Sequence, residues 1–449
     1  MRRLLMTLVL SSAVVAVAQT PSVLVISIDG MRPDYVTHAE EHALKLPTLR
    51  GMMQQGAYAE GVRGVFPTVT YPSHTTLMTG VWPDKHGVYN NQRFDPEHKM
   101  EGAWYWYEDQ IKVPTLWSAV HAAGMSTASV GWPVTVDAND IDTLLPEYWR
   151  GNLGQTHNPD DRWLMNAISR PLNEIKTIEQ KIGVPYMEGN DTSLAGDEIK
   201  TQYSIEILKS AKPKFMTIHL SSLDEEEHLH GPFSKEADED LEALDGMVAR
   251  LIAQERTEDP QAVVAVVSDH GFANIDKGLN LAVPFLKAGL MSTSGKDGWK
   301  AEPWPLGCMY AIMLHDPEDV ATRRQVKAIL DQVASDPANG VEAVLDPAQV
   351  AKAGGVPDAA WVVTLRKGFT SVPPNTPGGL VIPIPGHRGT HGYDPATTPE
   401  MRASLFVTGP GIAKHKDLGV VDMRSIAPTL AEMLGVTLTD ATQPRLDLR

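Results

Sequence analysis

The chain has 449 residues, a formal net charge of −17 and an apolar fraction of 42%. So acidic a chain repels long polyanions, and we expect no binding of nucleic-acid polymers. The apolar fraction and the ten tryptophans are typical of a folded globular protein, and the single cysteine excludes an intrachain disulfide.

The first eighteen residues have the pattern of a secretory signal peptide. Arg2 and Arg3 precede an apolar run that ends in the small-x-small sequence Ala16-Val17-Ala18. The run is shorter than the roughly 20 residues that span a membrane, so we expect no stable membrane insertion. We therefore expect residues 1–18 to be removed and residues 19–449 to be an exported protein, periplasmic or secreted, of a bacterium.

Strand and helix patterns alternate along the chain, as they do in α/β proteins. Near-continuous apolar runs predict buried, mostly parallel strands at 22–28, 126–131, 215–223, 262–267 and 403–407. Start and stop residues together with apolar periodicity predict helices at 47–55, 72–79, 113–124, 194–211, 234–254 and 422–434. Gly56 is expected to end the first of these helices in a left-handed conformation. The fold class is therefore α/β, with a mostly parallel central sheet flanked by helices.

Two stretches interrupt the alternation of strands and helices. Residues 132–193 mix Asp, Asn, Trp, Pro and Gly without sustained periodicity. Residues 285–385 have a helix of their own at 320–334, strands near 309–314 and 360–365, and a proline-rich loop at 372–385. We expect both stretches to be cap or lid insertions in one domain that covers residues 19–449.

Aspartates stand at the ends of three predicted strands, and histidines accompany them. Ligands bind at the carboxyl ends of strands in open α/β sheets. A single aspartate in such a place is usually a turn or cap residue, but three ends with histidines attached indicate a metal site. Mixed imidazole and carboxylate ligands favour zinc over magnesium or calcium. The candidate ligands of this kind are Asp29, Asp224, His228, Asp269, His270 and His391.

Thr70 stands at the start of a predicted helix, in the sequence Phe66-Pro-Thr-Val-Thr70-Tyr71-Pro-Ser-His74. Apolar and aromatic neighbours make it an unusual helix cap, but a hydroxyl in this place suits a nucleophile whose pKa a metal lowers. With Thr70 included, the candidate ligands are too many for one tetrahedral ion and suit two. The helix amides after Thr70 and the side chain of Asn91 are candidates to bind phosphoryl oxygens. These residues indicate metal-assisted phosphoryl transfer through a covalent phosphothreonine.

The combined motifs resemble those of the nucleotide pyrophosphatase/phosphodiesterase family, the type I phosphodiesterases of the alkaline phosphatase superfamily. The resemblance runs from about residue 22 to about residue 435. It rests on the segments Asp29-Gly-Met-Arg-Pro-Asp34, Phe66–His74, Thr79-Gly-Val-Trp-Pro-Asp-Lys-His-Gly87, Asn91, Asp224-x3-His228-x2-Gly231-Pro232, Ser268-Asp-His-Gly271 and His391-Gly-Tyr393.

The resemblance implies an alkaline-phosphatase-like fold and a hydrolase with two Zn²⁺ ions. It implies substrates that are nucleotides or similar small molecules with a phosphodiester or pyrophosphate bond. Thr70 would be the nucleophile and Asn91 would bind a phosphoryl oxygen, while Tyr71 takes the place of an aromatic that stacks on the nucleoside base. The implied ligands are Asp224, His228 and His391 for one ion, and Asp29, Thr70, Asp269 and His270 for the other.

The sequence departs from the family pattern between two of the implied ligands. Glu225, Glu226 and Glu227 replace the small polar residues that are usual there. Three carboxylates beside the metals would repel a multiply charged nucleotide, unless they belong to a solvated turn of helix. The aromatic sequence Trp104-Tyr-Trp-Tyr107 fits either a pocket wall or a substrate contact.

Other functions remain open at this point. A phosphate monoesterase would use the same metals and nucleophile, although Trp132-Pro133 resembles a motif of the diesterase branch. A sulfatase needs Cys or Ser at the nucleophile position, which Thr70 does not provide. A non-catalytic, secreted metal-binding protein is a remote alternative, because every implied ligand position is filled.

Overall fold

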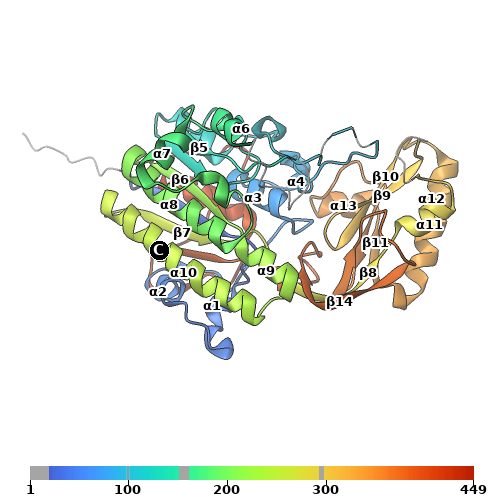
Figure 1. Cartoon of the computed structure of the whole chain (residues 1–449). Coiled ribbons are helices and arrows are strands. Elements are labelled where there is room, and N and C mark those ends of the chain that lie inside the picture. Colours follow the sequence, from blue (N-terminus) through green and yellow to red (C-terminus); the bar gives the residue numbers. More distant parts are fainter. Residues whose placement is uncertain (1–19, 98, 101, 151–160, 293–297) are drawn as a thin grey trace, which may run out of the picture.

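The computed structural model describes residues 20–97, 99–100, 102–150, 161–292 and 298–449. An eight-stranded sheet forms the core of its larger lobe, where Figure 1 labels strands β5, β6 and β7. The predicted signal peptide, residues 1–18, lies outside the described residues. In spatial order the strands are β16 (Lys416–Asp417), β2 (Ala57–Tyr58), β15 (Leu405–Thr408), β7 (Val263–Val267), β1 (Val23–Ile28), β6 (Phe215–Leu220), β4 (Thr127–Val130) and β5 (Thr143–Leu145). From β7 to β5 all neighbours are parallel, whereas β15 is antiparallel to β7. The expected mostly parallel sheet is confirmed.

Helices cover both faces of this sheet (Figure 1). They are α2 (Pro47–Gln55), α3 (Thr70–Thr79), α5 (Leu116–Ala122), α8 (Leu194–Ala211), α10 (Lys235–Glu258) and α14 (Ile426–Met433). Leu24 and Ile26 of β1 pack with α2, α8 and α10 on one face. Val23 and Val25 pack with α3, α5 and α14 on the other. Because the strand is buried on both sides, all of its residues except Ser27 are apolar.

A second lobe, residues 282–292 and 298–365, gathers at one end of the molecule, in yellow and orange in Figure 1. Its four-stranded sheet has the order β11 (Val341–Leu345), β12 (Trp361–Leu365), β10 (Met309–Leu314) and β9 (Ala301–Pro305). The helices α11 (Ala282–Lys287), α12 (Val320–Ser335) and α13 (Pro347–Lys352) belong to the same lobe. A three-stranded sheet adjoins it, formed by β13 (Gly368–Ser371), β8 (Ala273–Leu279) and β14 (Val381–Thr390). In the chain, β8 follows Asp269 and His270, and β14 leads directly to His391.

Two local predictions outside the candidate site are wrong. Gly56 has φ −142°, because the chain continues in an extended conformation into β2, and a Cβ there would lie 2.0 Å from the Val407 carbonyl oxygen. The predicted proline-rich loop at 372–385 contains the start of β14, which pairs antiparallel with β8. The pairing register shifts between Pro383 and Arg388, and such an irregularity is where a strand tolerates proline.

The stretch 132–193 contributes to the central sheet as well as to its surroundings. Within it, β5 pairs in parallel with β4 at the edge of the sheet. It also contains α6 (Asp161–Ile168) and α7 (Glu174–Ile182). Within the described residues, no helix has both the length and the apolar character that a membrane span requires.

Candidate active site

Two of the candidate ligand segments meet because they follow neighbouring parallel strands. Asp29 directly follows β1, and Asp269 and His270 come just after β7. The Gly30 N–H donates a hydrogen bond to Asp269 Oδ1 at 3.2 Å, which joins the two strand ends. Asp29 Oδ1 lies 3.3 Å from His270 Nε2, and Asp269 Oδ2 lies 3.1 Å from the same nitrogen.

The sequence predicted Asp224 at the end of a strand, and this prediction is wrong. Strand β6 ends at Leu220, and Asp224 lies in the first turn of α9 (Ser222–His230). The N–H of Ser222 donates to Asp197 Oδ2 at 2.8 Å, so a carboxylate from α8 satisfies a free donor at the start of α9. In the helix, Asp224 and His228 are four residues apart and share a face, with 3.5 Å between Asp224 Oδ2 and His228 Nε2.

Thr70 is the first residue of α3, and its side chain faces the same cluster. Thr70 Oγ1 lies 3.4 Å from His270 Nε2, and the residue is 7% exposed. One turn later, His74 Nδ1 is 2.9 Å from the Thr70 carbonyl oxygen, which fixes the start of the helix. A hydroxyl at this helix start therefore points at the ends of β1 and β7.

The candidate ligands form two groups that touch. Atoms of Asp224, His228 and His391 lie within 4.8 Å of one another, and so do atoms of Asp29, Asp224 and His270. Asp224 belongs to both groups. Asp269 and Thr70 adjoin the second group through His270. The structure thus brings together every residue that the sequence proposed as a metal ligand.

Two histidines present a nitrogen lone pair to the cluster. His391 Nδ1 is 2.9 Å from the Thr68 carbonyl oxygen, and His228 Nδ1 is 3.1 Å from the Gly389 carbonyl oxygen. Because a carbonyl oxygen only accepts, Nδ1 carries the proton in each ring and Nε2 is left as a ligand atom. In both rings Nε2 is the atom nearest Asp224.

The charges of this cluster fit divalent cations. Asp29 Oδ1, Asp224 Oδ1 and Asp269 Oδ2 are buried and have no hydrogen-bond partner within the described part of the chain. Burial, and then the neighbouring carboxylates, raise the pKa of Asp29 and of Asp269 well above its ordinary value. Such carboxylates need a cation to stay ionised in the protein interior. Burial, and then His228, lower the pKa of His391 to about 3, so its imidazole is neutral and able to bind a metal.

Asn91 and Tyr71 lie beside the candidate nucleophile. The N–H of Tyr71 donates to Asn91 Oδ1 at 2.9 Å, which leaves the amide nitrogen of Asn91 as a donor. The Tyr71 hydroxyl donates to Glu147, and its ring packs against Trp104 and Trp106 with centroids 5.5 and 6.1 Å away. Tyr71 is only 2% exposed. Its predicted role in stacking on a base stays a prediction, while Trp104 and Trp106 form an aromatic wall around it.

The three consecutive glutamates of α9 point in different directions. Glu227 is fully buried and accepts a hydrogen bond from the Tyr35 hydroxyl at 2.8 Å. Glu226 Oε2 lies 3.5 Å from His230 Nε2 on the outer part of the helix. Glu225 accepts a hydrogen bond from the Thr192 hydroxyl at 3.5 Å. They therefore do not form one block of negative charge facing the candidate ligands.

The sequence did not reveal two further residues beside Asp29. His219 Nε2 is 2.9 Å from Asp29 Oδ2, and His219 Nδ1 is 3.2 Å from Glu147 Oε2. For His219, the sequence offered one signal: a histidine one residue before the end of a buried, apolar strand. Glu147 comes from a segment without periodicity, and its sequence carried no signal.

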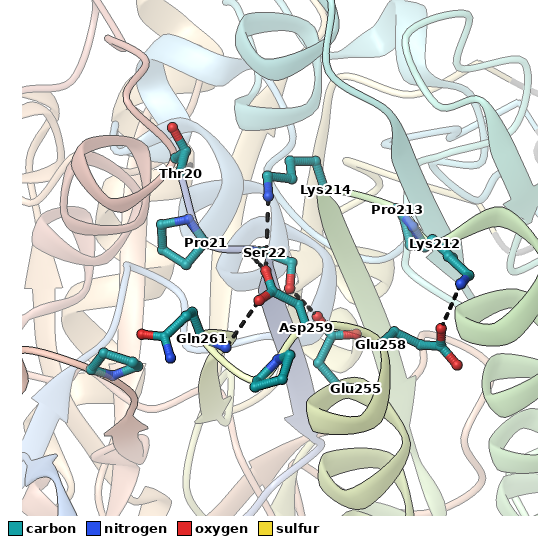
Figure 2. A pocket seen from close by; sticks show the side chains of 12 residues that line it. Thr20, Pro21, Ser22, Lys212, Pro213, Lys214, Glu255, Glu258, Asp259 and Gln261 are labelled. Carbon is teal, nitrogen blue, oxygen red and sulfur yellow. Dashed lines mark hydrogen bonds and ion pairs between the residues drawn. The ribbon is translucent and has the colours of Figure 1, made fainter. Parts of the chain in front are cut away.

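Figure 2 shows a cavity of about 760 Å³ at the end of the central strands opposite to the candidate ligands. Ser22 and Lys214 directly precede β1 and β6, so this cavity lies at the amino ends of the strands. Its lysines pair with its acids, Lys212 with Glu258 at 2.9 Å and Lys214 with Asp259 at 3.8 Å. None of the candidate ligands lines it. It is separate from the active site.

Comparison with known proteins assigns the chain to a family. A family model described as type I phosphodiesterase / nucleotide pyrophosphatase matches residues 23–394, a range that contains all the candidate ligands. The chain belongs to this family. The resemblance inferred from the motifs is thereby confirmed. The type I phosphodiesterase / nucleotide pyrophosphatase family is metal-dependent, and the two groups of candidate ligands are where this member can hold metal ions.

The relatives of this family member are distant. Ectonucleotide pyrophosphatase/phosphodiesterase family member 1 of Homo sapiens is 25% identical over 266 residues, which are 56% of this chain and 24% of that protein. Bis(5'-adenosyl)-triphosphatase ENPP4 of Bos taurus is 25% identical over 265 residues, 58% of this chain and 49% of that protein. The matched part of the chain thus spans half or less of the length of these relatives.

A solved structure has the same fold over nearly the whole chain. Murine ectonucleotide pyrophosphatase/phosphodiesterase 5 superposes with a TM-score of 0.66 at 19% identity, covering 95% of this chain and 97% of that chain. The likeness confirms the expected alkaline-phosphatase-like α/β fold.

Proposed function

We propose that this chain is a two-zinc hydrolase that cleaves phosphodiester or pyrophosphate bonds of nucleotides or similar small substrates. The proposal depends above all on the Thr70 hydroxyl, which lies 3.4 Å from His270 Nε2 at the start of α3. Membership of the type I phosphodiesterase / nucleotide pyrophosphatase family supports the reaction class.

The proposed metal ligands divide into two sets, one for each zinc. Both sets contain imidazole and carboxylate donors, which suit zinc, and one of the two sets adds a hydroxyl. When bound, the zinc ions supply positive charge that lowers the pKa of a hydroxyl and neutralises phosphoryl oxygens. The sets are Asp224, His228 and His391 for one ion, and Asp29, Thr70, Asp269 and His270 for the other.

Thr70 acts as the nucleophile in this proposal. Its Oγ1 forms a bond to phosphorus while the bond from phosphorus to the leaving oxygen breaks, and the hydroxyl proton passes to solvent. Water then attacks the phosphothreonine, the bond between phosphorus and Thr70 breaks, and the free hydroxyl returns. Splitting the hydrolysis in this way replaces one difficult displacement with two easier ones.

Asn91 binds the phosphoryl group in the same proposal. Its Oδ1 is held by the Tyr71 N–H, so the side chain is fixed with its amide nitrogen free to donate. A donor fixed in advance stabilises the charge that develops on a phosphoryl oxygen without reorganising during the reaction.

A solved structure of a related protein supports both the nucleophile and the substrate class. One solved structure of murine ectonucleotide pyrophosphatase/phosphodiesterase 5 is described as an inactive threonine-to-alanine variant in complex with AMP. We transfer to this chain the expectation that a nucleoside monophosphate group occupies the site beside Thr70.

Substrate comparison tests the proposal against a phosphate monoesterase with the same site. Zinc-loaded enzyme is assayed with bis(p-nitrophenyl) phosphate, a p-nitrophenyl ester of a nucleoside 5'-monophosphate, p-nitrophenyl phosphate and p-nitrophenyl sulfate. We expect the nucleotide ester and the diester to have the highest kcat/KM. A kcat/KM at least about tenfold higher for the monoester, a difference of about 1.4 kcal/mol in transition-state binding, would overturn the diesterase assignment.

The N-terminal sequence supports a proposal about the cellular location of the protein. The basic start and apolar run of residues 1–18 support export, and so does the word "ectonucleotide" in the names of the relatives. We therefore propose an exported enzyme, with residues 19–449 as one catalytic domain. Detection of the chain starting at Gln19 in a periplasmic or culture-medium fraction checks this point, and a cytosolic chain that retains Met1 would contradict it.

A further inference from the structure

The two oxygens of the Asp29 carboxylate have different environments. Oδ2 is 2.9 Å from His219 Nε2. Oδ1 is buried, has no hydrogen-bond partner in the described part of the molecule and lies 3.3 Å from His270 Nε2. His219 therefore engages one oxygen and leaves the other facing the candidate metal ligands.

The ring of His219 is itself fixed in place. His219 Nδ1 lies 3.1 Å from the Gly131 carbonyl oxygen and 3.2 Å from Glu147 Oε2, and the residue is 2% exposed. Both of these partners are acceptors, and so is the Asp29 carboxylate at Nε2, so each nitrogen of the ring faces an acceptor. The rings of His74 and His219 pack edge to face, with 4.5 Å between centroids. Hydrogen bonds and packing together prevent the imidazole from turning away from Asp29.

Glu147 connects His219 with the residue that follows the nucleophile. Its Oε1 accepts a hydrogen bond from the Tyr71 hydroxyl, while its Oε2 faces His219. A continuous set of contacts therefore runs from Tyr71 through Glu147 and His219 to Asp29. Tyr71 is adjacent to Thr70 in α3, so the same contacts link the helix of the nucleophile to the end of β1.

We propose that His219 and Glu147 are positioning residues of the metal site, which hold Asp29 so that Oδ1 alone is presented to a zinc ion. The inference rests on the proposed function, because it requires Asp29 to be a zinc ligand. A carboxylate free to rotate can bind through either oxygen or turn away, and its affinity for metal falls accordingly. Loss of such a supporting hydrogen bond typically costs about 10- to 100-fold in metal affinity or activity.

A purely structural role for His219 makes a different prediction. If the contact only satisfied a buried carboxylate, its removal would lower stability and leave the zinc affinity of the folded protein unchanged. Zinc affinity is therefore the measurement that separates the two roles, and it does not depend on turnover.

Matched substitutions at His219 provide the test. His219→Phe keeps a planar ring and removes both hydrogen bonds, whereas His219→Gln keeps a donor that can reach Asp29. Glu147→Ala removes a hydrogen-bond partner of His219, and Glu147 is less buried than His219. Glu255→Gln is the control, because Glu255 is also a buried carboxylate but lies at the amino end of the sheet, where it accepts a hydrogen bond from the Ser22 hydroxyl.

Each metal-free protein is titrated with Zn²⁺ in competition with a chromophoric chelator, and circular dichroism verifies folding. We expect His219→Phe to bind one zinc equivalent about 10- to 100-fold more weakly. Glu147→Ala should weaken the same equivalent, His219→Gln should bind more tightly than His219→Phe, and Glu255→Gln should match the native protein.

If folded His219→Phe bound zinc with native affinity, the inference would be overturned while the proposed function would stand. If His219→Phe did not fold, native zinc affinity in Glu147→Ala would have the same consequence. Equal weakening in all four variants, the control included, would also overturn it by assigning the loss to general destabilisation. A native protein that binds no zinc would instead overturn the proposed function itself.

Discussion

The imidazole rings of His270 and His391 stack on each other, with centroids 3.6 Å apart and an angle of 9° between their planes. His270 follows β7 and His391 follows β14, so the contact joins the central sheet to the smaller three-stranded sheet. The two rings belong to different groups of candidate ligands. Because the rings touch, displacement of one moves the other, and we expect the two metal positions to depend on each other.

Removal of the metal should lower both activity and stability. Three buried carboxylate oxygens would then lack a partner, and their charges would destabilise the folded state. A ligand at a hundredfold excess over its Kd contributes about 2.7 kcal/mol to stability. We expect EDTA to abolish phosphodiester hydrolysis and to lower the Tm by at least about 2 °C, and added Zn²⁺ to restore both. Unchanged Tm and activity in protein shown by elemental analysis to be metal-free would contradict this.

Thr70→Ala should abolish turnover and leave the fold nearly unchanged. The substitution removes the hydroxyl that lies beside His270 but retains a helix-forming residue at the start of α3. We expect kcat to fall by at least about 10³-fold, as it does when a nucleophile is removed, with Tm and zinc content close to native. Thr70→Ser keeps the hydroxyl and is the matched control, for which substantial activity is expected. Comparable activity in Thr70→Ala and in the native enzyme would remove Thr70 from the mechanism.

Asn91→Ala should weaken transition-state binding without removing the nucleophile. Loss of one fixed donor to a developing oxyanion typically costs about 10²- to 10³-fold in kcat. Asn91→Asp keeps the acceptor for the Tyr71 N–H but replaces the amide donor with a negative charge, so we expect it to be no more active than Asn91→Ala. Steady-state kinetics on the nucleotide ester measure both variants. If Asn91→Asp retained native kcat/KM, Asn91 would not donate to the phosphoryl group.

Stability should fall as pH rises through the range in which Glu302 of β9 ionises. Burial raises the pKa of this carboxyl from its ordinary 4.5 to about 7, so the folded chain holds the proton more tightly than the unfolded chain. The contribution of Glu302 is therefore most favourable below about pH 4.5 and is lost as the pH rises to 7 and beyond. Thermal denaturation of the native protein and of Glu302→Gln at pH 5 and pH 8 measures it. The native Tm should fall more than that of Glu302→Gln, and equal falls would show that Glu302 does not contribute.

The sequence predicted the parts of the site that follow buried strands. Asp29 and Asp269 stand next to apolar runs, and the carboxyl ends of neighbouring parallel strands meet at one edge of a sheet. Local patterns also predicted helix α8 at 194–211, the residues it occupies in the structure. These features depend on short stretches of sequence, in which periodicity and end signals suffice.

Features that depend on contacts between distant segments were not predictable in this way. Residues 215–223 look like one apolar strand, but α9 starts within them because Asp197 of α8 accepts a hydrogen bond from the Ser222 N–H. His219 reaches Asp29 through the register of β6 against β1, in which His219 is paired with Ser27. Neither the register nor the position of Glu147 can be read from local periodicity.

The stereochemical course at phosphorus tests the covalent phosphothreonine most directly. A p-nitrophenyl ester of a nucleoside 5'-phosphorothioate, of one configuration at phosphorus, is hydrolysed in H₂¹⁸O by the zinc-loaded enzyme, and the configuration of the labelled product is determined. Each in-line displacement inverts phosphorus, so attack by Thr70 followed by attack by water predicts overall retention. Overall inversion would mean a single attack by water and would contradict the role assigned to Thr70.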